Sequence, residues 1–553
     1  MLDSKTLQVV PLGGLGEIGK NMTAVRQESG IVLVDAGMAF PDEETPGIDL
    51  ILPDFTYLRE HQDELKGIVL THGHEDHVGA LPYLLREFNV PVYGTKLTLG
   101  LVRSKLQEFG IKWGDLREVE AGDTQRLGGF GIEFVNVNHS IPDAVAVAMR
   151  TNAGLIVFSG DYKIDLTPIE GEPMDLSRLA SLGEEGVLAY FGDSTNSALP
   201  GYVPSEKVVE ATFQEVFGKA EGRIIVASFA SHIHRVSQAV EAAKKHDRLI
   251  GVMGRSMVRN VQIARELGYL DLPPQMLVEQ RDMGRVPDSD IAILMTGSQG
   301  EPLAALSRVA AGTHQSIEVG VSDRVVIAAH PIPGNERGVA RTINNLMKNG
   351  AQVYYSPLHK VHVSGHAAQE EQKLVLALLK PHYLVPVHGE FRMLRQHANT
   401  AMSMGIPEEN IFILENGSRM EFKDGKARRI DNVAAGMFLV DAGAIADTSE
   451  AIMRERQQLS GEGMFIVVAR INAQNGQLLR APEVISRGFM DPQASNGLVD
   501  ESIAVVTRTL ERTAKRSVTD WNELKTEIRK DLSGFLSQKT RKRPIIIPVI
   551  VEV

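Results

Sequence analysis

The run His72-Gly73-His74-Glu75-Asp76-His77 constrains this chain more than any other feature of its sequence. Val69-Leu70-Thr71 predicts a strand that ends at the run, and Val78 to Pro82 predicts the start of a helix. Two imidazoles at alternate positions of such a segment can face one metal ion. Asp76 and His77 can then reach a second ion about 3.5–4 Å away. The run therefore predicts a two-metal site on a loop at the end of a strand.

The chain has 553 residues and no cysteine, so any metal must be held by His, Asp and Glu. Hydrophobic residues make up 43% and charged residues 23%, which is typical of globular proteins with several domains. The N-terminus has no signal-peptide pattern and no apolar stretch is long enough to span a bilayer, so we expect a cytoplasmic protein without membrane association. The net charge of −12 argues against nonspecific coating of nucleic acid but permits a local basic groove.

Strand-like runs broken by Gly, Pro and Asp fill the first part of the chain up to about residue 134. Residues 221–227 and 323–329 read as buried parallel strands with helices between them, so we expect a separate α/β unit there. Polar motifs like those of the first part resume at 361–390, which indicates that this unit is inserted into the first domain. A Gly/Ala-rich connector begins near residue 434, and the last unit should contain strands and a helix.

A glycine-rich segment, Gly14-Leu15-Gly16-Glu17-Ile18-Gly19, matches the dinucleotide-binding pattern and nearly matches a phosphate-binding loop. Residues 21–25 lead directly into another strand, so no helix N-terminus is offered to a phosphate. Asn21 also stands where a Ser or Thr would have to reach Mg²⁺. We interpret the segment as a turn that lets two strands approach closely near the active site.

Three further residues follow strand-like runs and are candidates for the remaining ligands: His139, Asp161 and His388. Asp35 also follows a strand. From local sequence alone, Asp35 fits a turn residue as well as a group that orients the metal ligands. Glu75 should point away from the metals.

With these residues in this order, the sequence resembles the metallo-β-lactamase superfamily. The resemblance implies an αββα sandwich in which His72, His74 and His139 hold one metal, Asp76, His77 and His388 hold the other, and Asp161 bridges them. It also implies that Asp35 orients the cage. The cofactor would be two divalent ions, zinc first, with manganese or magnesium as alternatives.

Residues 162–387 separate Asp161 from His388, which is far more than a simple sandwich needs. This layout resembles the β-CASP group of nucleic-acid-processing enzymes. The resemblance implies a first domain formed by 1–205 and 349–433, a β-CASP domain at 206–348, a linker at 434–459 and a small α+β C-terminal domain at 460–553. His366 paired with Asp193 would be the catalytic acid, Asp76 would contribute to catalysis as a ligand, and a histidine at position 366 favours RNA over DNA. From local sequence alone, Asp193 is as compatible with a turn.

Segments such as 228–235 and 254–257 extend the resemblance over nearly the whole chain, to the bacterial ribonuclease J family. It implies 5′→3′ exoribonuclease activity on single-stranded RNA with a 5′-monophosphate, and endonuclease activity, in rRNA processing and mRNA decay. The implied partners are RNA, a second copy of the chain in a dimer or tetramer, and an RNA-degradation complex. The expected RNA pocket contains Ser231, His362, Ser364, Gly365, His366 and Arg255.

Basic residues are candidates for contacts to the RNA backbone, although each also fits an ordinary surface charge. They are Arg235, Arg255, Arg337 and Arg341. The basic run at 539–543 more often marks a solvated face. Three other functions stay open from the sequence: a DNA-directed nuclease of the same group, a metallohydrolase of small molecules, and a catalytically inactive scaffold that binds RNA.

Overall fold

The computed structural model describes residues 3–42, 44–112, 114–300, 304–332, 335–446, 450–489, 492–516, 518 and 520–553. Glu301, Pro333 and Gly334 are among the residues that lie outside this description. The chain divides into two compact units. One comprises 1–39 and 51–438, and the other comprises 40–50 and 439–553.

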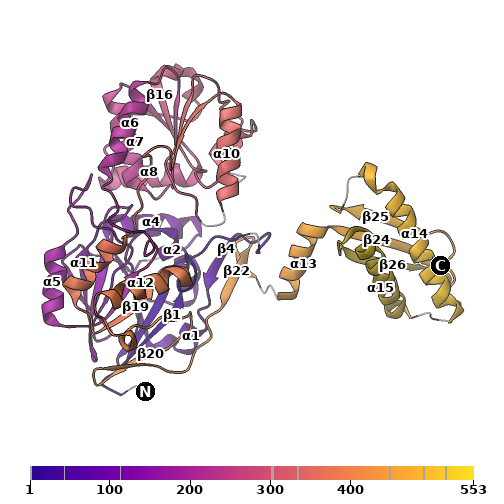
Figure 1. Ribbon diagram of the computed structural model, residues 1–553, viewed down its shortest axis with the longest axis horizontal. Coiled ribbons are helices and arrows are strands. Elements are labelled where there is room, and N and C mark those ends of the chain that lie inside the picture. Colours follow the sequence, from indigo (N-terminus) through magenta and orange to yellow (C-terminus); the bar gives the residue numbers. More distant parts are fainter. Residues whose placement is uncertain are drawn as a thin grey trace. The chain divides into compact units, whose positions relative to one another are not determined.

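The first unit contains an eight-stranded sheet (Figure 1). Its inner strands are short, apolar and largely buried, whereas its two edge strands carry charged and exposed residues. Strands β3, β5, β6 and β7 are parallel, and β1 and β20 extend the sheet in antiparallel fashion. In spatial order the strands are β21 (Lys426–Arg429), β20 (Met420–Lys423), β1 (Thr6–Gly13), β2 (Met22–Gln27), β3 (Gly30–Val34), β5 (Leu65–Val69), β6 (Val92–Gly94) and β7 (Leu116–Glu118).

A six-stranded sheet faces the first, because buried side chains of both sheets share one hydrophobic cluster that includes Val32 and Phe134. Its order is β19 (Tyr383–Val387), β12 (Val187–Asp193), β11 (Gly154–Phe158), β10 (Val145–Thr151), β9 (Phe130–Asn136) and β8 (Thr124–Leu127).

Helices cover the outer faces of both sheets. Figure 1 shows the helices that lie on the second sheet. Their leucines and valines enter a further buried cluster. These helices are α5 (Leu176–Glu185), α11 (Gln369–Leu379) and α12 (Phe391–Ser403). The helices beside the first sheet are α1 (Thr56–Glu60), α3 (Leu81–Glu87) and α4 (Lys96–Glu108). The expected αββα sandwich is confirmed.

A wholly parallel six-stranded sheet forms the inserted domain, as its uniformly apolar strands predict. The order is β15 (Leu277–Val278), β14 (Leu249–Met253), β16 (Ile291–Met295), β13 (Ile224–Ala227), β17 (Arg324–Ile327) and β18 (Gln352–Tyr355). Apolar residues on its two faces enter separate clusters. The covering helices are α6 (Lys207–Gly218), α7 (Ile233–Lys245), α8 (Arg255–Leu267), α9 (Ala305–Ala310) and α10 (Glu336–Lys348).

The second unit has its own core of apolar side chains, which includes Phe465, Val506 and Leu532. Its sheet consists of β25 (Glu483–Arg487), β24 (Met464–Ile471) and β26 (Ile545–Glu552), and its helices are α13 (Glu450–Glu462), α14 (Pro492–Lys515) and α15 (Trp521–Thr540). Segment 434–459, expected as a connector, also holds the paired strands β22 (Met437–Asp441) and β23 (Ala444–Ala446). Within the described part of the chain, no helix is both long and apolar enough for a transmembrane span.

Residues 14–19 form a loop between the antiparallel strands β1 and β2, and no helix follows them. The expectation that this segment leads directly into a strand is therefore confirmed.

A buried ionic network joins the sandwich to the inserted domain. The Glu206 carboxylate accepts a hydrogen bond from Arg235 Nη2 at 2.9 Å and another from Lys163 Nζ at 3.2 Å. Arg235 is 0% exposed. The expectation that Arg235 contacts the RNA backbone is wrong, because α7 buries its guanidinium against Glu206 and leaves it no access to a ligand.

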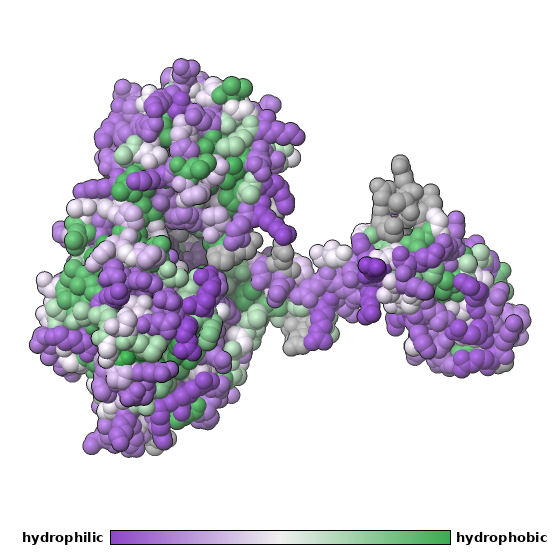
Figure 2. Space-filling model, viewed as in Figure 1, coloured by the Kyte–Doolittle hydropathy of each residue, from purple (hydrophilic) through white to green (hydrophobic). Residues whose placement is uncertain are grey.

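Arg337 and Arg341, by contrast, are exposed on α10. Hydrophilic residues predominate on the face of the inserted domain drawn in Figure 2.

Replacing Arg235 by Ala should strongly destabilise the junction, because it leaves part of the Glu206 charge buried without its partner. Losing one partner of a buried ion pair typically costs about 3–5 kcal/mol. Chemical denaturation followed by fluorescence and circular dichroism would measure the loss. The control is Arg341→Ala at an exposed position, which should change stability by no more than about 0.5 kcal/mol. Equal stability of the two variants would contradict the structural role of Arg235.

Candidate metal centre

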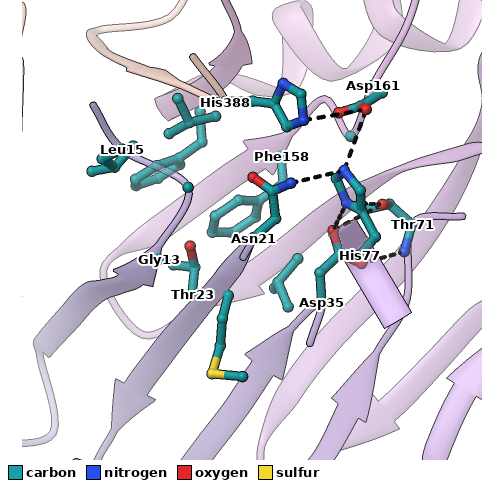
Figure 3. A pocket seen from close by; sticks show the side chains of 16 residues that line it. Gly13, Leu15, Asn21, Thr23, Asp35, Thr71, His77, Phe158, Asp161 and His388 are labelled. Carbon is teal, nitrogen blue, oxygen red and sulfur yellow. Dashed lines mark hydrogen bonds and ion pairs between the residues drawn. The ribbon is translucent and has the colours of Figure 1, made fainter. Parts of the chain in front are cut away.

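Loops that leave the ends of four strands supply the candidate ligands, three of which are labelled in Figure 3: His77, Asp161 and His388. β5 leads to the run from His72 to His77, β9 to His139, β11 to Asp161 and β19 to His388. β3 leads to Asp35, and β12 ends on Asp193. Two of these residues turn the chain sharply: Asp35 has φ 59° and His388 has φ 54°. Such left-handed backbone is uncommon outside glycine and often occurs at functional sites.

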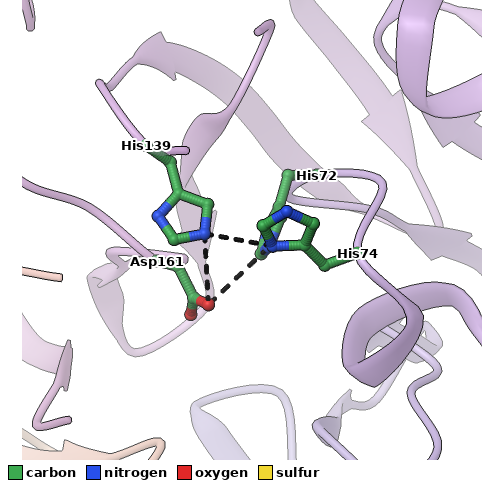
Figure 4. Close-up of side chains that lie close together, drawn as sticks. All are labelled: His72, His74, His139 and Asp161. Carbon is green, nitrogen blue, oxygen red and sulfur yellow. Dashed lines mark hydrogen bonds and ion pairs between the residues drawn. The ribbon is translucent and has the colours of Figure 1, made fainter. Parts of the chain in front are cut away.

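The first ligand group consists of His72, His74, His139 and Asp161 (Figure 4). His74 Nδ1 lies 3.1 Å from His72 Nε2 and 3.1 Å from His139 Nε2. Asp161 Oδ2 lies 3.7 Å from His72 Nε2 and 3.8 Å from His139 Nε2. All four donor atoms lie within 4.8 Å of one another, which suits a single metal ion.

The second group consists of Asp76, His77, Asp161 and His388. His77 Nε2 lies 3.2 Å from Asp161 Oδ2 and 3.6 Å from Asp76 Oδ2. His388 Nε2 lies 3.5 Å and 3.3 Å from the same two oxygens. The Asp161 carboxylate thus belongs to both groups, in the position of a bridging ligand.

The donor chemistry of the first group fits a metal ion. Burial lowers the pKa of His74 to about 4 and holds the pKa values of His72 and His139 well below the ordinary range. These imidazoles are therefore neutral and can offer lone pairs. In the second group burial opposes ionisation of Asp76, but the His77 ring outweighs it and lowers the pKa of Asp76. Neutral imidazoles and ionised carboxylates are the donors that Zn²⁺ and Mn²⁺ accept.

Asp35 orients His77 through Nδ1, the ring nitrogen that faces away from the other ligands. Its Oδ2 lies 2.8 Å from His77 Nδ1, and both of its oxygens accept hydrogen bonds of 2.8 Å from Thr71. A proton on His77 Nδ1 leaves Nε2 free to face the metal. The contacts favour the orienting role over a simple turn.

Other ligands have similar supports that the sequence did not reveal. His139 Nδ1 lies 2.8 Å from the Gly365 carbonyl, and His388 Nδ1 lies 2.6 Å from Thr195 Oγ1. A Cβ at Gly365 would come within 2.6 Å of His139 Nδ1, so only glycine fits there. Glu75 points elsewhere, as expected, and pairs with Lys105.

His366 and Asp193 lie beside the cage. His366 Nδ1 is 2.8 Å from Asp193 Oδ2 and 4.0 Å from Asp161 Oδ2. Burial lowers the pKa of His366, but the Asp193 carboxylate more than offsets this effect, so its pKa stands above the ordinary value. A protonated imidazole held by a carboxylate can donate a proton to a substrate.

The residues expected in the RNA pocket occupy loops around His366 and at strand ends of the inserted sheet. Ser364 Oγ accepts a hydrogen bond of 2.8 Å from Asn196 Nδ2. The His362 ring lies 4.8 Å from the His330 ring, and His362 Nδ1 has no hydrogen-bond partner. Ser231 is half-buried in the loop before α7, and Arg255 is exposed at the first position of α8.

This cage, on a sandwich interrupted by a parallel α/β domain, defines a metallohydrolase of the metallo-β-lactamase fold with a β-CASP insertion. Family models match in the same order: "Metallo-beta-lactamase superfamily" at 15–176, "Ribonuclease J, beta-CASP domain" at 221–346, "Zn-dependent metallo-hydrolase RNA specificity domain" at 350–414 and "Ribonuclease J C-terminal domain" at 451–553. The chain belongs to the ribonuclease J family.

Relatives match over nearly their full length. Ribonuclease J2 of Bacillus subtilis is 40% identical to this chain, and the match covers 100% of this chain and 99% of the relative. Ribonuclease J of Thermus thermophilus is also 40% identical, and the match covers 99% of this chain and 95% of the relative. A solved protein of unknown function from Enterococcus faecalis shares the fold, with a TM-score of 0.52 and 15% identity over 75% of this chain and 99% of its own. The protein is thus a ribonuclease, a hydrolase that binds RNA and metal.

Replacing Asp35 by Ala should weaken metal binding at the second group, because the His77 ring loses the partner that fixes its orientation. Losing such a partner typically costs about 10–100-fold in metal affinity. Titration of the metal-stripped protein with zinc, followed by elemental analysis, would measure the effect. Unaltered affinity for both ions would contradict the orienting role of Asp35.

Proposed function

We propose that the protein degrades single-stranded RNA from the 5′ end, prefers a 5′-monophosphate, and also cuts internally. The observation that carries the proposal is the His366–Asp193 pair, which lies against the cage with His366 Nδ1 4.0 Å from Asp161 Oδ2. A proton donor at this position can serve the oxygen that leaves when a phosphodiester is hydrolysed.

The cage would hold two divalent cations, zinc first, on the two groups that share Asp161. When bound, the cations would supply Lewis acidity toward the phosphate and a nucleophile from water near neutral pH. His72, His74 and His139 would hold one cation, and Asp76, His77 and His388 would hold the other, with Asp161 in both groups. His366, held by Asp193, protonates the leaving 3′-oxygen.

The 5′ end would be recognised by the loop that also carries His366. Ser364 offers a hydroxyl, Gly365 approaches without a side chain, and His362 has an unpartnered ring nitrogen. Hydroxyl, imidazole and backbone donors in a concave loop suit a terminal phosphate. Because Gly365 also contacts the ligand His139, the pocket adjoins the cage and would present the bond nearest the 5′ end for cleavage.

RNA would run between the sandwich and the inserted domain, with Arg255, Arg337 and Arg341 available to its phosphates. The second unit has a core of its own, and we assign it to self-association into a dimer or tetramer. We also propose that the protein takes part in rRNA processing and mRNA decay as a member of an RNA-degradation complex.

RNA with a 5′-monophosphate should be degraded faster than the same RNA with a 5′-triphosphate, by roughly tenfold or more if one charge-assisted hydrogen bond is at stake. Single-stranded DNA of the same sequence should resist. Time courses resolved on denaturing gels would measure the rates, with His77→Ala protein as the control for contaminating nucleases. Faster cleavage of DNA would favour the DNA-directed alternative. Equal rates for both RNA ends would contradict the 5′-end pocket.

Replacing His366 by Ala should slow the cleavage step by about 10²–10⁴-fold, the usual contribution of a general acid, while both metals stay bound. Single-turnover kinetics would measure the rate, and elemental analysis would verify the metal content. His382→Ala, which removes an exposed imidazole at the opposite end of β19 from His388, should retain the catalytic rate. Full activity of the His366 variant would remove the proposed acid.

A further inference from the structure

The glycine-rich loop between β1 and β2 has no part in the mechanism above, although it is the most regular motif of the N-terminal sequence. No helix follows it, so it offers no helix N-terminus to a phosphate. The loop ends at Asn21, and this residue lies directly against the turn that carries Asp76 and His77 (Figure 3).

Asn21 makes several contacts to that turn. Its side-chain nitrogen Nδ2 donates to the Asp76 carbonyl at 3.0 Å and to Asp76 Oδ2 at 3.4 Å, and it lies 3.0 Å from His77 Nε2. Its backbone N–H donates to the same Asp76 carbonyl at 3.0 Å. Asn21 thus contacts the donor atoms of both residues that the turn contributes to the second ligand group.

Two glycines make room for this arrangement. A Cβ at Gly14 would lie 2.4 Å from Asn21 Oδ1, and a Cβ at Gly37 would lie 1.6 Å from the Asp76 carbonyl oxygen. Gly37 N–H also donates to the Asn21 carbonyl at 2.9 Å. Gly14 therefore allows the Asn21 carboxamide to lie where it does, which gives the first glycine of the motif a physical reason.

A small cavity of about 50 Å³ is lined both by residues of this loop and by residues of the second ligand group. Gly14 and Asn21 line one side, and His77, Asp161 and His388 line the other. The carboxamide thus borders the second ligand group.

Several other ligands have a supporting partner outside the ligand groups. His77 is held by Asp35, His388 by Thr195 and His139 by Gly365. The Asp76 side chain is 29% exposed and projects from α2 (Glu75–Val78), a helix of only four residues. Apart from the ligands His77 and His388, the partner of its carboxylate is Asn21.

We propose that Asn21 is a positioning residue that sets the affinity of the second metal site, with Gly14 shaping the space for its carboxamide. The inference rests on the proposed metal centre. The Asn21 N–H groups fix the Asp76 carboxylate and backbone so that the carboxylate faces the cation together with His77 and His388. The first site, which contains neither Asp76 nor His77, does not depend on Asn21.

Replacing Asn21 by Ala should weaken the second site by about 10–100-fold and leave the first site unchanged. Asn21→Leu, which keeps most of the volume but removes the donor, should have the same effect. Equilibration of metal-stripped protein in zinc buffers, followed by elemental analysis, measures both affinities independently of activity. Ribonuclease activity of both variants should recover when free zinc is raised, which shows that the fold is intact.

Two matched controls separate the possible results. Asn416→Ala removes an amide that contacts the same loop at Leu15 and Glu17, and it should keep both sites at full affinity. His77→Ala should lose the second metal at every zinc concentration. Full second-site affinity in Asn21→Ala or in Asn21→Leu would overturn the role of the Asn21 donor while leaving the metal centre intact. Retention of both metals by His77→Ala would instead overturn the metal centre itself.

Discussion

One buried carboxylate, that of Asp161, organises the functional part of this protein. Its Oδ2 lies between 3.2 and 4.0 Å from nitrogen atoms of five imidazoles, which come from loops after three different strands and from the segment after the insertion. Asp161 is only 2% exposed, and an isolated charge in such a place would be strongly unfavourable. Although burial opposes ionisation, the His388 and His77 rings outweigh it and hold the pKa of Asp161 low. Sandwich, insertion and loops all serve to bring these partners together.

Around this centre, hydrogen bonds from different parts of the fold fix three of the histidine ligands: His77, His388 and His139. Asp35, Thr195 and Gly365 each bind the imidazole nitrogen that faces away from the cage. Gly365 lies one residue from His366, so the same loop supports a metal ligand and positions the proposed proton donor. The chemistry of the site therefore depends on the residues that hydrogen-bond to the ligands as well as on the ligands themselves.

The residues that the sequence singled out as ligands come together in the structure, and they could be singled out because His and Asp at the ends of apolar strands leave a local pattern. It could not reveal Asn21 or Thr195 as partners of ligands, since their contacts arise only when distant loops meet. It misjudged Arg235 for the related reason that burial on α7 depends on packing against Glu206. Helix α14 also escaped prediction, because its first residues, which include glycine, proline and several polar side chains, resemble a loop. The sequence thus indicated which residues could bind a metal, but it did not indicate which distant residues would contact them in the fold.

The second ligand group joins Asp76 to His388, two residues that are 312 positions apart in the chain. During translation the ribosome must therefore finish the first half of the sandwich, the whole inserted domain and strand β19 before this group can close. A nascent chain that stops earlier carries the first-group ligands but lacks the last donor of the second. A ribonuclease built in this way therefore lacks a complete second ligand group until residue 388 of its 553 residues has been translated.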